Sequence, residues 1–251
     1  MPSVLSQISR RQLLASALPA SIVLTVPARA AAQALPFVVI GDWGRRGADH
    51  QAEVARRMGE TASAIGSRFV ISVGDNFYED GVQSLEDAHW RQSFEEIYTA
   101  PALQTPWHVI LGNHDYRGEI APQLAYHTKS PRWLMPARYF SRRETLADGS
   151  AADFFFLDTS PFIRAYRGTA VRIDGQDTAA QLAWLDRALG RSEARWKIVI
   201  GHHPLHRLSG DHRRGCDGGA GRRAGNGGIE RKTVLFCKKE PKNVCPVRPR
   251  A

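Results

Sequence analysis

Cysteine is missing from most of this chain. All three cysteines of the 251-residue sequence (Cys216, Cys237 and Cys245) lie in its final 36 residues, and residues 31–207 contain none. A segment without cysteine has no disulfide framework, so residues 31–207 must be stabilised by a packed core. The segment is long enough for one substantial α/β domain with a well-buried core.

The same segment also lacks an excess of positive charge, although the whole chain carries a formal net charge of +9. Residues 31–207 hold 20 basic and 21 acidic side chains, so the excess basic charge lies in residues 1–30 and 208–251. A nucleic-acid-binding protein is expected to carry a basic patch on its folded domain. The distribution of charge therefore argues against a nucleic acid as a partner.

A hydrophobic run of membrane-spanning length is missing from the N-terminal region. Residues 13–26 are apolar apart from Ser and Thr, which is too short a stretch for a comfortable membrane span. The pair Arg10-Arg11 precedes it, and the small-residue segment 28–30 follows it. This order is typical of a secretory signal, and the paired arginines favour the twin-arginine route. We expect residues 1–30 to be a cleaved signal peptide, and the mature protein to be periplasmic or secreted without a stable membrane span.

Apolar runs that alternate with helical patterns predict one α/β domain over residues 31–207. Residues 117–150 are polar and irregular and contain proline, which predicts a long surface excursion. Asp177 is available as an N-cap and Gly190 as a terminator for the last predicted helix. The predicted strands are residues 35–40, 68–73, 107–111, 154–158 and 196–200, and the predicted helices are residues 48–65, 84–99 and 178–190.

Four of these strands end in glycine followed by a polar side chain. In open α/β sheets, ligand sites collect at the carboxyl ends of strands. Helix capping can explain a single aspartate after a strand, but it does not explain four polar groups at one sheet edge. Carboxylate, amide and imidazole groups together suit a cation such as ferric iron, Mn²⁺ or Zn²⁺. The candidate metal ligands are Asp42, Asp75, Asn113 and His202, with Tyr78 close behind Asp75.

Four motifs carry a family resemblance. The segments G-D-W-G (41–44), G-D-N-F-Y (74–78), G-N-H-D (112–115) and G-H-H-P (201–204) resemble the calcineurin-like metallophosphoesterases. More narrowly, they resemble the purple acid phosphatase branch of the tartrate-resistant type, over about residues 36–205. The resemblance implies a metallophosphoesterase β-sandwich flanked by helices.

The resemblance also implies a binuclear metal centre, with Fe³⁺ beside a divalent ion such as Fe²⁺, Zn²⁺ or Mn²⁺. Asp75 would bridge the two ions, and Asp42 and Tyr78 would bind the ferric ion. Asn113 and His202 would bind the divalent ion. The implied reaction is the hydrolysis of a phosphoric monoester on a small phosphorylated substrate, by in-line attack of a metal-bound hydroxide on phosphorus.

The resemblance leaves two alternative roles for each of two histidines near these candidate ligands. His114 would stabilise developing charge or protonate the leaving alkoxide, or alternatively would only orient a ligand. His203 stands where purple relatives often have tyrosine, so it is either a substrate contact or a bystander. Asp115 is expected to orient His114, and Asp158 is expected to have a structural role.

The tail departs from the family pattern. The next family motif, G-H-x-H on a further strand, supplies one histidine to each metal, yet residues 208–251 contain His212 as their only histidine. Eight glycines and eleven basic residues predict a disordered segment, with residues 233–236 the nearest to an apolar strand. We therefore expect the sandwich to be incomplete and to lack its C-terminal strands. A shifted reading frame near residue 207 would explain the change in composition.

Several alternatives stay open at this point. A phosphodiesterase or pyrophosphatase could use the same scaffold. A truncated, non-catalytic product is the alternative of another class, because the final G-H-x-H ligands are missing. The three cysteines with His212 could form a zinc knuckle, although their spacing matches no compact site. The sequence indicates no oligomeric state.

Overall fold

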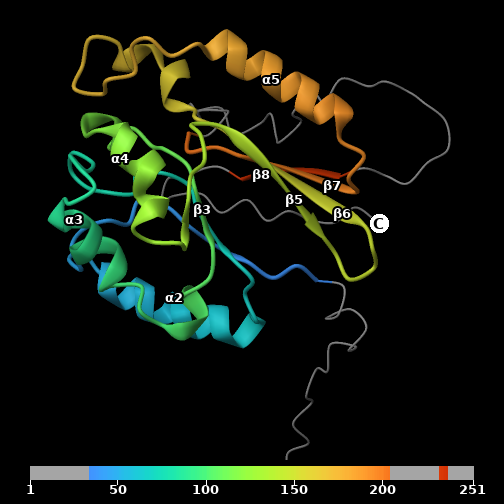
Figure 1. The fold of residues 1–251 in the computed structure, drawn as a ribbon, viewed down its shortest axis with the longest axis horizontal. Coiled ribbons are helices and arrows are strands. Elements are labelled where there is room, and N and C mark those ends of the chain that lie inside the picture. Colours follow the sequence, from blue (N-terminus) through green and yellow to red (C-terminus); the bar gives the residue numbers. More distant parts are fainter. Residues whose placement is uncertain (1–33, 204–231, 237–251) are drawn as a thin grey trace, which may run out of the picture. The chain divides into compact units, whose positions relative to one another are not determined.

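The computed structural model describes residues 34–203 and 232–236 of the chain (Figure 1). The predicted signal peptide and most of the predicted tail lie outside these residues. Within the described ranges, no helix is both long enough and apolar enough to cross a membrane.

Four short parallel strands form the first sheet. They are β1 (Val38–Ile40), β2 (Val70–Ser72), β3 (Trp107–Val109) and β4 (Trp133–Leu134). They pair in the order β1-β2-β3-β4, so their carboxyl ends all lie at one edge of the sheet. The first three lie inside predicted strands, each shorter than the apolar run that predicted it.

Four further strands form the second sheet. They are β5 (Phe140–Thr145), β6 (Ala151–Phe156), β7 (Trp196–Ile200) and β8 (Lys232–Phe236). β5 runs antiparallel to β6, whereas β6, β7 and β8 are mutually parallel neighbours. The predicted strand over residues 196–200 coincides with β7, and β6 begins a few residues before its predicted start.

Strand β5 corrects the prediction of an irregular excursion over residues 117–150. Its sequence, F-S-R-R-E-T, has no apolar run, and its pairing with β6 is supported by one stacked ring pair, Phe140 with Phe156, and by charge. Arg143 donates two hydrogen bonds to Asp153 of β6, with donor–acceptor distances of 2.7 and 2.8 Å. A strand of this composition does not stand out as an apolar run in the sequence. Strand β4, in the same region, is only two residues long and forms no such run either.

The tail also needs one correction. The expectation of disorder over residues 208–251 is wrong for residues 232–236, because these form β8 beside β7. The register pairs Trp196 with Lys232 and Ile200 with Phe236. The apolar tetrad 233–236, noted in the sequence as the nearest to a strand, therefore extends the second sheet. The rest of 208–251 lies outside the described residues.

The two sheets face each other across a hydrophobic core. Alternate residues of a strand point to opposite faces, so β2 places Val70 in one core and Ile71 in the other. The core between the sheets contains Phe69, Ile71, Val73 and Ile110 from the first sheet region, and Phe154, Phe156, Ile198 and Ile200 from the second. This arrangement is a β-sandwich, as expected.

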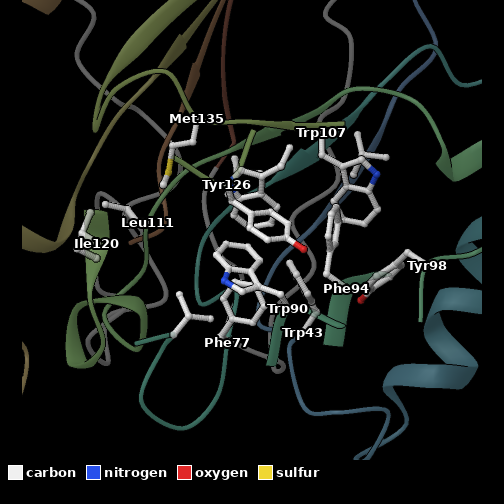
Figure 2. Packing of buried hydrophobic residues seen from close by; sticks show 14 of the residues in the cluster. Trp43, Phe77, Trp90, Phe94, Tyr98, Trp107, Leu111, Ile120, Tyr126 and Met135 are labelled. Atoms are coloured by element: carbon white, nitrogen blue, oxygen red, sulfur yellow. The ribbon is translucent and has the colours of Figure 1, made fainter. Parts of the chain in front are cut away.

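The other face of the first sheet packs on an aromatic cluster (Figure 2). The ring of Trp43 lies 5.4 Å from that of Phe77 and 6.0 Å from that of Trp107, between ring centroids. The ring of Phe77 lies 4.7 Å from that of Trp90. Such aromatic pairs stabilise a core beyond their buried area. Trp43 and Phe77 belong to two of the four motifs, so the cluster anchors the loops that carry the candidate ligands.

Helices cover the sandwich. The predicted helices over residues 48–65 and 178–190 correspond to α2 and α5, and the region 84–99 forms α3 followed by a π-helical turn. The side chain of Asp177 caps α5 by accepting a hydrogen bond from the backbone of Ala180, as predicted, but α5 runs one residue beyond Gly190. The helices are α2 (Gln51–Ile65), α3 (Ala88–Trp90), the π-helical turn (Arg91–Glu95), α4 (Ile120–Ala125) and α5 (Thr178–Arg191).

Short 3₁₀ turns complete the described structure. They are Pro101–Leu103, Asp115–Arg117, Tyr126–Thr128, Ser160–Phe162 and Arg164–Tyr166. Helix α2 packs against the aromatic side of the first sheet, where Ala55 and Ala62 are buried (Figure 1). Helix α5 is tied to the end of β6 through Gln181, whose side chain exchanges hydrogen bonds with the backbone of Asp158.

A buried histidine between the sheets should make stability depend on pH. Burial, reinforced by the positive charge of Arg142, lowers the pKa of His108 from its ordinary value of 6.5 to about 3. Between these two values the unfolded chain binds a proton that the folded chain does not, so stability falls as pH falls. We predict that lowering the pH from 7 to 5 reduces the free energy of unfolding of the native protein by up to about 2 kcal/mol more than that of the His108→Leu variant.

The measurement is urea unfolding at pH 7 and pH 5. The native protein should lose more stability between these pH values than the His108→Leu variant. The matched control is His127→Leu, because His127 is exposed. Equal pH dependence in the native protein and the His108→Leu variant contradicts the assignment.

Candidate metal centre

The two aspartates that follow strand-end glycines share an uncommon backbone conformation. Asp42 has a φ of 62° and Asp75 a φ of 51°, both in the left-handed region. This conformation costs about 1–3 kcal/mol for a residue other than glycine and clusters at functional sites. The backbone N–H of Asp42 donates to the carbonyl of Gly74, at 3.0 Å, which ties the two strand ends together.

The phenol of Tyr78 joins the two carboxylates. Its oxygen lies 2.7 Å from Oδ1 of Asp42 and 2.8 Å from Oδ2 of Asp75. Burial and the two neighbouring carboxylates raise the pKa of Tyr78 well above its ordinary value. The phenol has one proton to share between two carboxylates, so the three oxygens form a strongly acidic cluster. A cation is the natural replacement for that proton.

Asp75 is the hub of the cluster. Its Oδ1 accepts a hydrogen bond from the backbone N–H of His114, at 2.9 Å, and lies 3.4 Å from Nε2 of His202. Burial would raise the pKa of Asp75, but the contacts with His202, the backbone of His114 and Tyr78 outweigh it and hold that pKa well below its usual range. Asp75 is therefore an ionised carboxylate in the interior.

His202 is fully buried and oriented through its other ring nitrogen. Its Nδ1 lies 2.8 Å from the carbonyl oxygen of Val73, at the end of β2. A carbonyl only accepts, so Nδ1 carries a proton, and Nε2 is the ring nitrogen that faces Asp75. Metal-binding histidines are commonly fixed in this way by a backbone carbonyl.

Asn113 reaches the same edge because the preceding residue is glycine. A Cβ added to Gly112 would lie 2.3 Å from both the backbone nitrogen and Oδ1 of Asp75, so only glycine permits this approach. Asn113, which is half-buried, directly follows Gly112 and so lies next to the residue that approaches Asp75. The described contacts unite Asp42, Asp75, Tyr78 and His202, with Asn113 next to them.

The donor set is mixed in chemistry. Across residues 34–203 and 232–236, no three His, Cys, Asp or Glu side chains are grouped as a metal-binding cluster. The converging groups are instead two carboxylates, a phenol and an imidazole, with an amide alongside. Carboxylate, phenolate and imidazole ligands fit a ferric or a borderline divalent ion, so the residues present are compatible with the implied centre.

His114 lies against the cluster. Its ring centroid is 4.2 Å from that of Tyr78, and its Nδ1 lies 2.6 Å from the backbone oxygen of Glu79. The Glu79 carboxylate is 3.7 Å from the same nitrogen. The carbonyl acceptor assigns the proton to Nδ1, which leaves Nε2 as the nitrogen that can exchange a proton with a ligand.

His203 is held from both ring nitrogens. Nδ1 lies 2.9 Å from the hydroxyl of Thr159, and Nε2 lies 3.0 Å from the hydroxyl of Tyr166. Its ring stands perpendicular to that of His202, with 4.7 Å between centroids. The contact with substrate predicted for His203 stays a prediction, and these bonds show that its ring is fixed beside His202.

The expectation that Asp115 orients His114 is not what the described contacts show. Asp115 accepts hydrogen bonds from the backbone of Asn76, at 3.0 and 3.1 Å, and from the backbone of Gly112, at 2.8 Å. Burial and the nearby charge of Asp75 raise the pKa of Asp115 to about 7. Asp115 therefore fastens the two motif loops to each other. Its carboxylate also accepts hydrogen bonds from the side-chain amides of Asn76, at 3.2 Å, and Gln123, at 3.1 Å.

Asp158 has the structural role expected of it. Its Oδ2 accepts a hydrogen bond from the hydroxyl of Tyr116, which also accepts one from Arg138 at 2.8 Å. Burial raises the pKa of Asp158 to about 7. The contact fixes the turn that follows the G-N-H-D motif against the end of β6.

The sequence-based selection missed two charged residues at this site, Arg45 and Glu79. The guanidinium of Arg45 stacks on the ring of Tyr78, with 3.7 Å from Cζ to the ring centroid. Glu79 contacts both His114 and Arg45. Their sequence signal is adjacency alone, because each directly follows a motif.

Comparison with known proteins places this geometry in a family. The family model described as calcineurin-like phosphoesterase matches residues 35–226, which extends past the range read from the motifs. A solved structure entitled "GAP50 the anchor in the inner membrane complex of Plasmodium" is similar with a TM-score of 0.54 and 25% identity, covering 67% of this chain and 55% of that one. The expected metallophosphoesterase fold is confirmed.

Curated relatives are acid phosphatases by name. Purple acid phosphatase 4 of Arabidopsis thaliana is 40% identical over 186 residues, which are 70% of this chain and 53% of that protein. Purple acid phosphatase 3 of the same organism is 42% identical over 185 residues, 70% of this chain and 49% of that protein. Tartrate-resistant acid phosphatase type 5 of Homo sapiens is 31% identical over 198 residues, 74% of this chain and 61% of that protein. The chain spans about half the length of the first of these relatives.

The close approach at Gly112 gives a direct test of the site's construction. We predict that Gly112→Ala destabilises the protein by about 1–3 kcal/mol, because the new methyl group overlaps Asp75. Gly190→Ala is the matched control. The space around Gly190 is open and it lies within α5, so alanine should stabilise by about 0.5–1 kcal/mol. Thermal unfolding measures both, and a Gly112→Ala variant as stable as the native protein would show that the loop does not pack this way.

Proposed function

The chain belongs to the calcineurin-like phosphoesterase family, and on this premise we propose that it is a metal-dependent phosphoric monoester hydrolase of the acid phosphatase type. The observation that carries the proposal is the meeting of Asp42, Asp75 and Tyr78: the phenol oxygen of Tyr78 lies within 2.8 Å of a carboxylate oxygen of each aspartate. A structural aspartate after a strand needs no such partner. The substrate would be a small phosphorylated molecule.

We propose a binuclear centre at this site. Asp75 would be shared between two ions, Asp42 and Tyr78 would hold Fe³⁺, and Asn113 and His202 would hold Fe²⁺, Zn²⁺ or Mn²⁺. When bound, such a centre supplies Lewis-acid stabilisation of a phosphoryl group and lowers the pKa of water. The protein's contribution is to bring these donors together at the carboxyl ends of β1, β2, β3 and β7.

His114 is the residue proposed to handle the proton of the leaving group. The carbonyl of Glu79 holds the proton on Nδ1, so Nε2 is the atom available to the substrate. In the imidazolium form Nδ1–H stays on that carbonyl and Nε2 carries a second proton, which the ring would give to a departing alkoxide, leaving the neutral imidazole. His203, fixed by Thr159 and Tyr166, would line the same site without exchanging a proton.

Two alternative functions are considered beside monoester hydrolysis. Cleavage of diesters or pyrophosphate would use the same donors, and hydrolysis of bis(p-nitrophenyl) phosphate or pyrophosphate in preference to p-nitrophenyl phosphate would favour it. A non-catalytic product is favoured by one observation, that residues 208–251 contain no G-H-x-H. We also propose export by the twin-arginine route to the periplasm, on the basis of residues 1–30.

Metal content separates the leading proposal from the non-catalytic one. We predict that the purified protein holds about two metal ions per chain and hydrolyses p-nitrophenyl phosphate. Asp75→Asn should lower kcat by more than about 100-fold and reduce the metal content, because the shared carboxylate is lost. Asp186→Asn, at an exposed position of α5, is the control. A native chain without bound metal and without activity would reject the proposal.

Tyr78 gives a spectroscopic test of the ferric ion. A phenolate bound to ferric iron produces a visible charge-transfer band, which no other ligand of this set supplies. We predict that the protein loaded with iron is coloured and that Tyr78→Phe abolishes the band while the chain still folds. A band that persists in the Tyr78→Phe protein would contradict the assignment of Tyr78 as an iron ligand.

A further inference from the structure

The segment that follows G-D-W-G has an unusual backbone. Arg46 has a φ of 52°, Asp49 of 47° and His50 of 65°, and Gly47 between them has a φ of 80°. Left-handed conformations at residues other than glycine are unfavourable and persist only where the surroundings determine them. Three such residues within one short loop indicate that the loop is held in this shape by specific contacts.

A buried glutamine provides these contacts. The side-chain oxygen of Gln51 accepts hydrogen bonds from the backbone of Arg45, at 2.9 Å, and of Gly47, at 2.8 Å. Its amide nitrogen donates to the backbone oxygen of Ser93, at 2.7 Å, and the Ser93 hydroxyl accepts from the backbone of Arg46, at 2.9 Å. These bonds fix the loop to the core, so the backbone of Arg45, from which its side chain extends, is held in one position.

The loop presents Arg45 beside the candidate metal centre. The guanidinium lies over the ring of Tyr78, whose hydroxyl contacts Asp42 and Asp75. Stacking uses the face of the guanidinium and leaves its N–H edge for an oxyanion.

The carboxylates near that edge are weak partners for Arg45. Nη1 of Arg45 lies 3.4 Å from Asp49 and 3.6 Å from Glu79. Asp49 and Glu79 have side chains that are 71% and 66% exposed, whereas the side chain of Arg45 is 28% exposed. Exposed ion pairs of this kind contribute little, so a bound anion can replace them.

We propose that Arg45 is a specificity-determining residue that binds a second anionic group of the substrate, next to the phosphoryl group at the metal centre. The inference rests on the proposed phosphatase function and names its substrate class: phosphate esters whose leaving group carries a carboxylate or a further phosphate. The charge-assisted bond between a guanidinium and an oxyanion supplies the preference. A neutral leaving group gains nothing from Arg45.

The preference can be tested with two phosphate esters that are alike except for one group. 3-Phosphoglycerate and glycerol 3-phosphate differ in a carboxylate against a hydroxymethyl group. In the full chain, Arg45→Gln should lower the ratio of kcat/KM for 3-phosphoglycerate to that for glycerol 3-phosphate about tenfold. Arg45→Lys should restore part of the ratio. Asp49→Asn should raise it, because a carboxylate that competes for Arg45 is removed.

The charge control is Arg57→Gln, on the exposed surface of α2, which should keep the native ratio. Equal loss on both esters in Arg45→Gln would overturn the proposal, since Arg45 would then only support the loop. If the native chain hydrolyses neither ester, the phosphatase proposal fails separately. Calorimetric binding of the same two esters to the native and Arg45→Gln proteins then decides: a fall in the affinity ratio supports the role of Arg45, and an unchanged ratio overturns it.

Discussion

The carboxylate of Asp75 ties together parts of the chain that are far apart in sequence. The phenol of Tyr78, in the same loop as Asp75, donates a hydrogen bond to it. The backbone of His114 contacts it from the loop after β3, and the imidazole of His202 contacts it from the end of β7. Each approach depends on a glycine or a backbone bond that brings the loop close. Because β7 belongs to the second sheet, the contact with His202 also joins the two layers of the sandwich at the site. An ionised carboxylate buried at such a junction is stable only while these partners remain.

The unfavourable backbone at Asp42 and Asp75 is compensated by the aromatic core beneath it. Trp43 directly follows Asp42, and Phe77 lies two residues after Asp75, so both strained loops end in rings of one cluster (Figure 2). The indole N–H of Trp43 also donates to the hydroxyl of Ser72, at 2.8 Å, within β2. In these motifs the acidic residue supplies chemistry and the aromatic residue supplies the anchor. The buried rings therefore stabilise the loops in which Asp42 and Asp75 hold their uncommon backbone conformation.

Features encoded by neighbouring residues can be predicted from the sequence, whereas contacts between distant parts of the chain cannot. Apolar runs that end in glycine and a polar residue located the strand ends and the candidate ligands Asp42, Asp75, Asn113 and His202, because that pattern is local. β5 is not evident from the sequence because a charged pair, Arg143 with Asp153, takes the place of an apolar run. The partners of Asp115 are not evident either, because Asn76 and Gln123 come from other parts of the fold. Adjacency to a motif does not single out Arg45 and Glu79, since their importance arises from contacts across the fold. Local patterns predicted the ligands, whereas the residues around them required the structure.

The two proposed roles, anion binding by Arg45 and proton transfer by His114, meet at Glu79. Its backbone oxygen holds Nδ1 of His114, and its carboxylate lies 3.7 Å from that nitrogen and 3.6 Å from Arg45. An anion bound by Arg45 competes with this carboxylate, so occupancy of the anion site alters the charge beside His114. A change at Glu79 would disturb both functions, whereas Arg45 makes none of the described hydrogen bonds of His114. Arg45 is therefore the position at which substrate preference can change while the tautomer of His114 stays fixed by the Glu79 backbone.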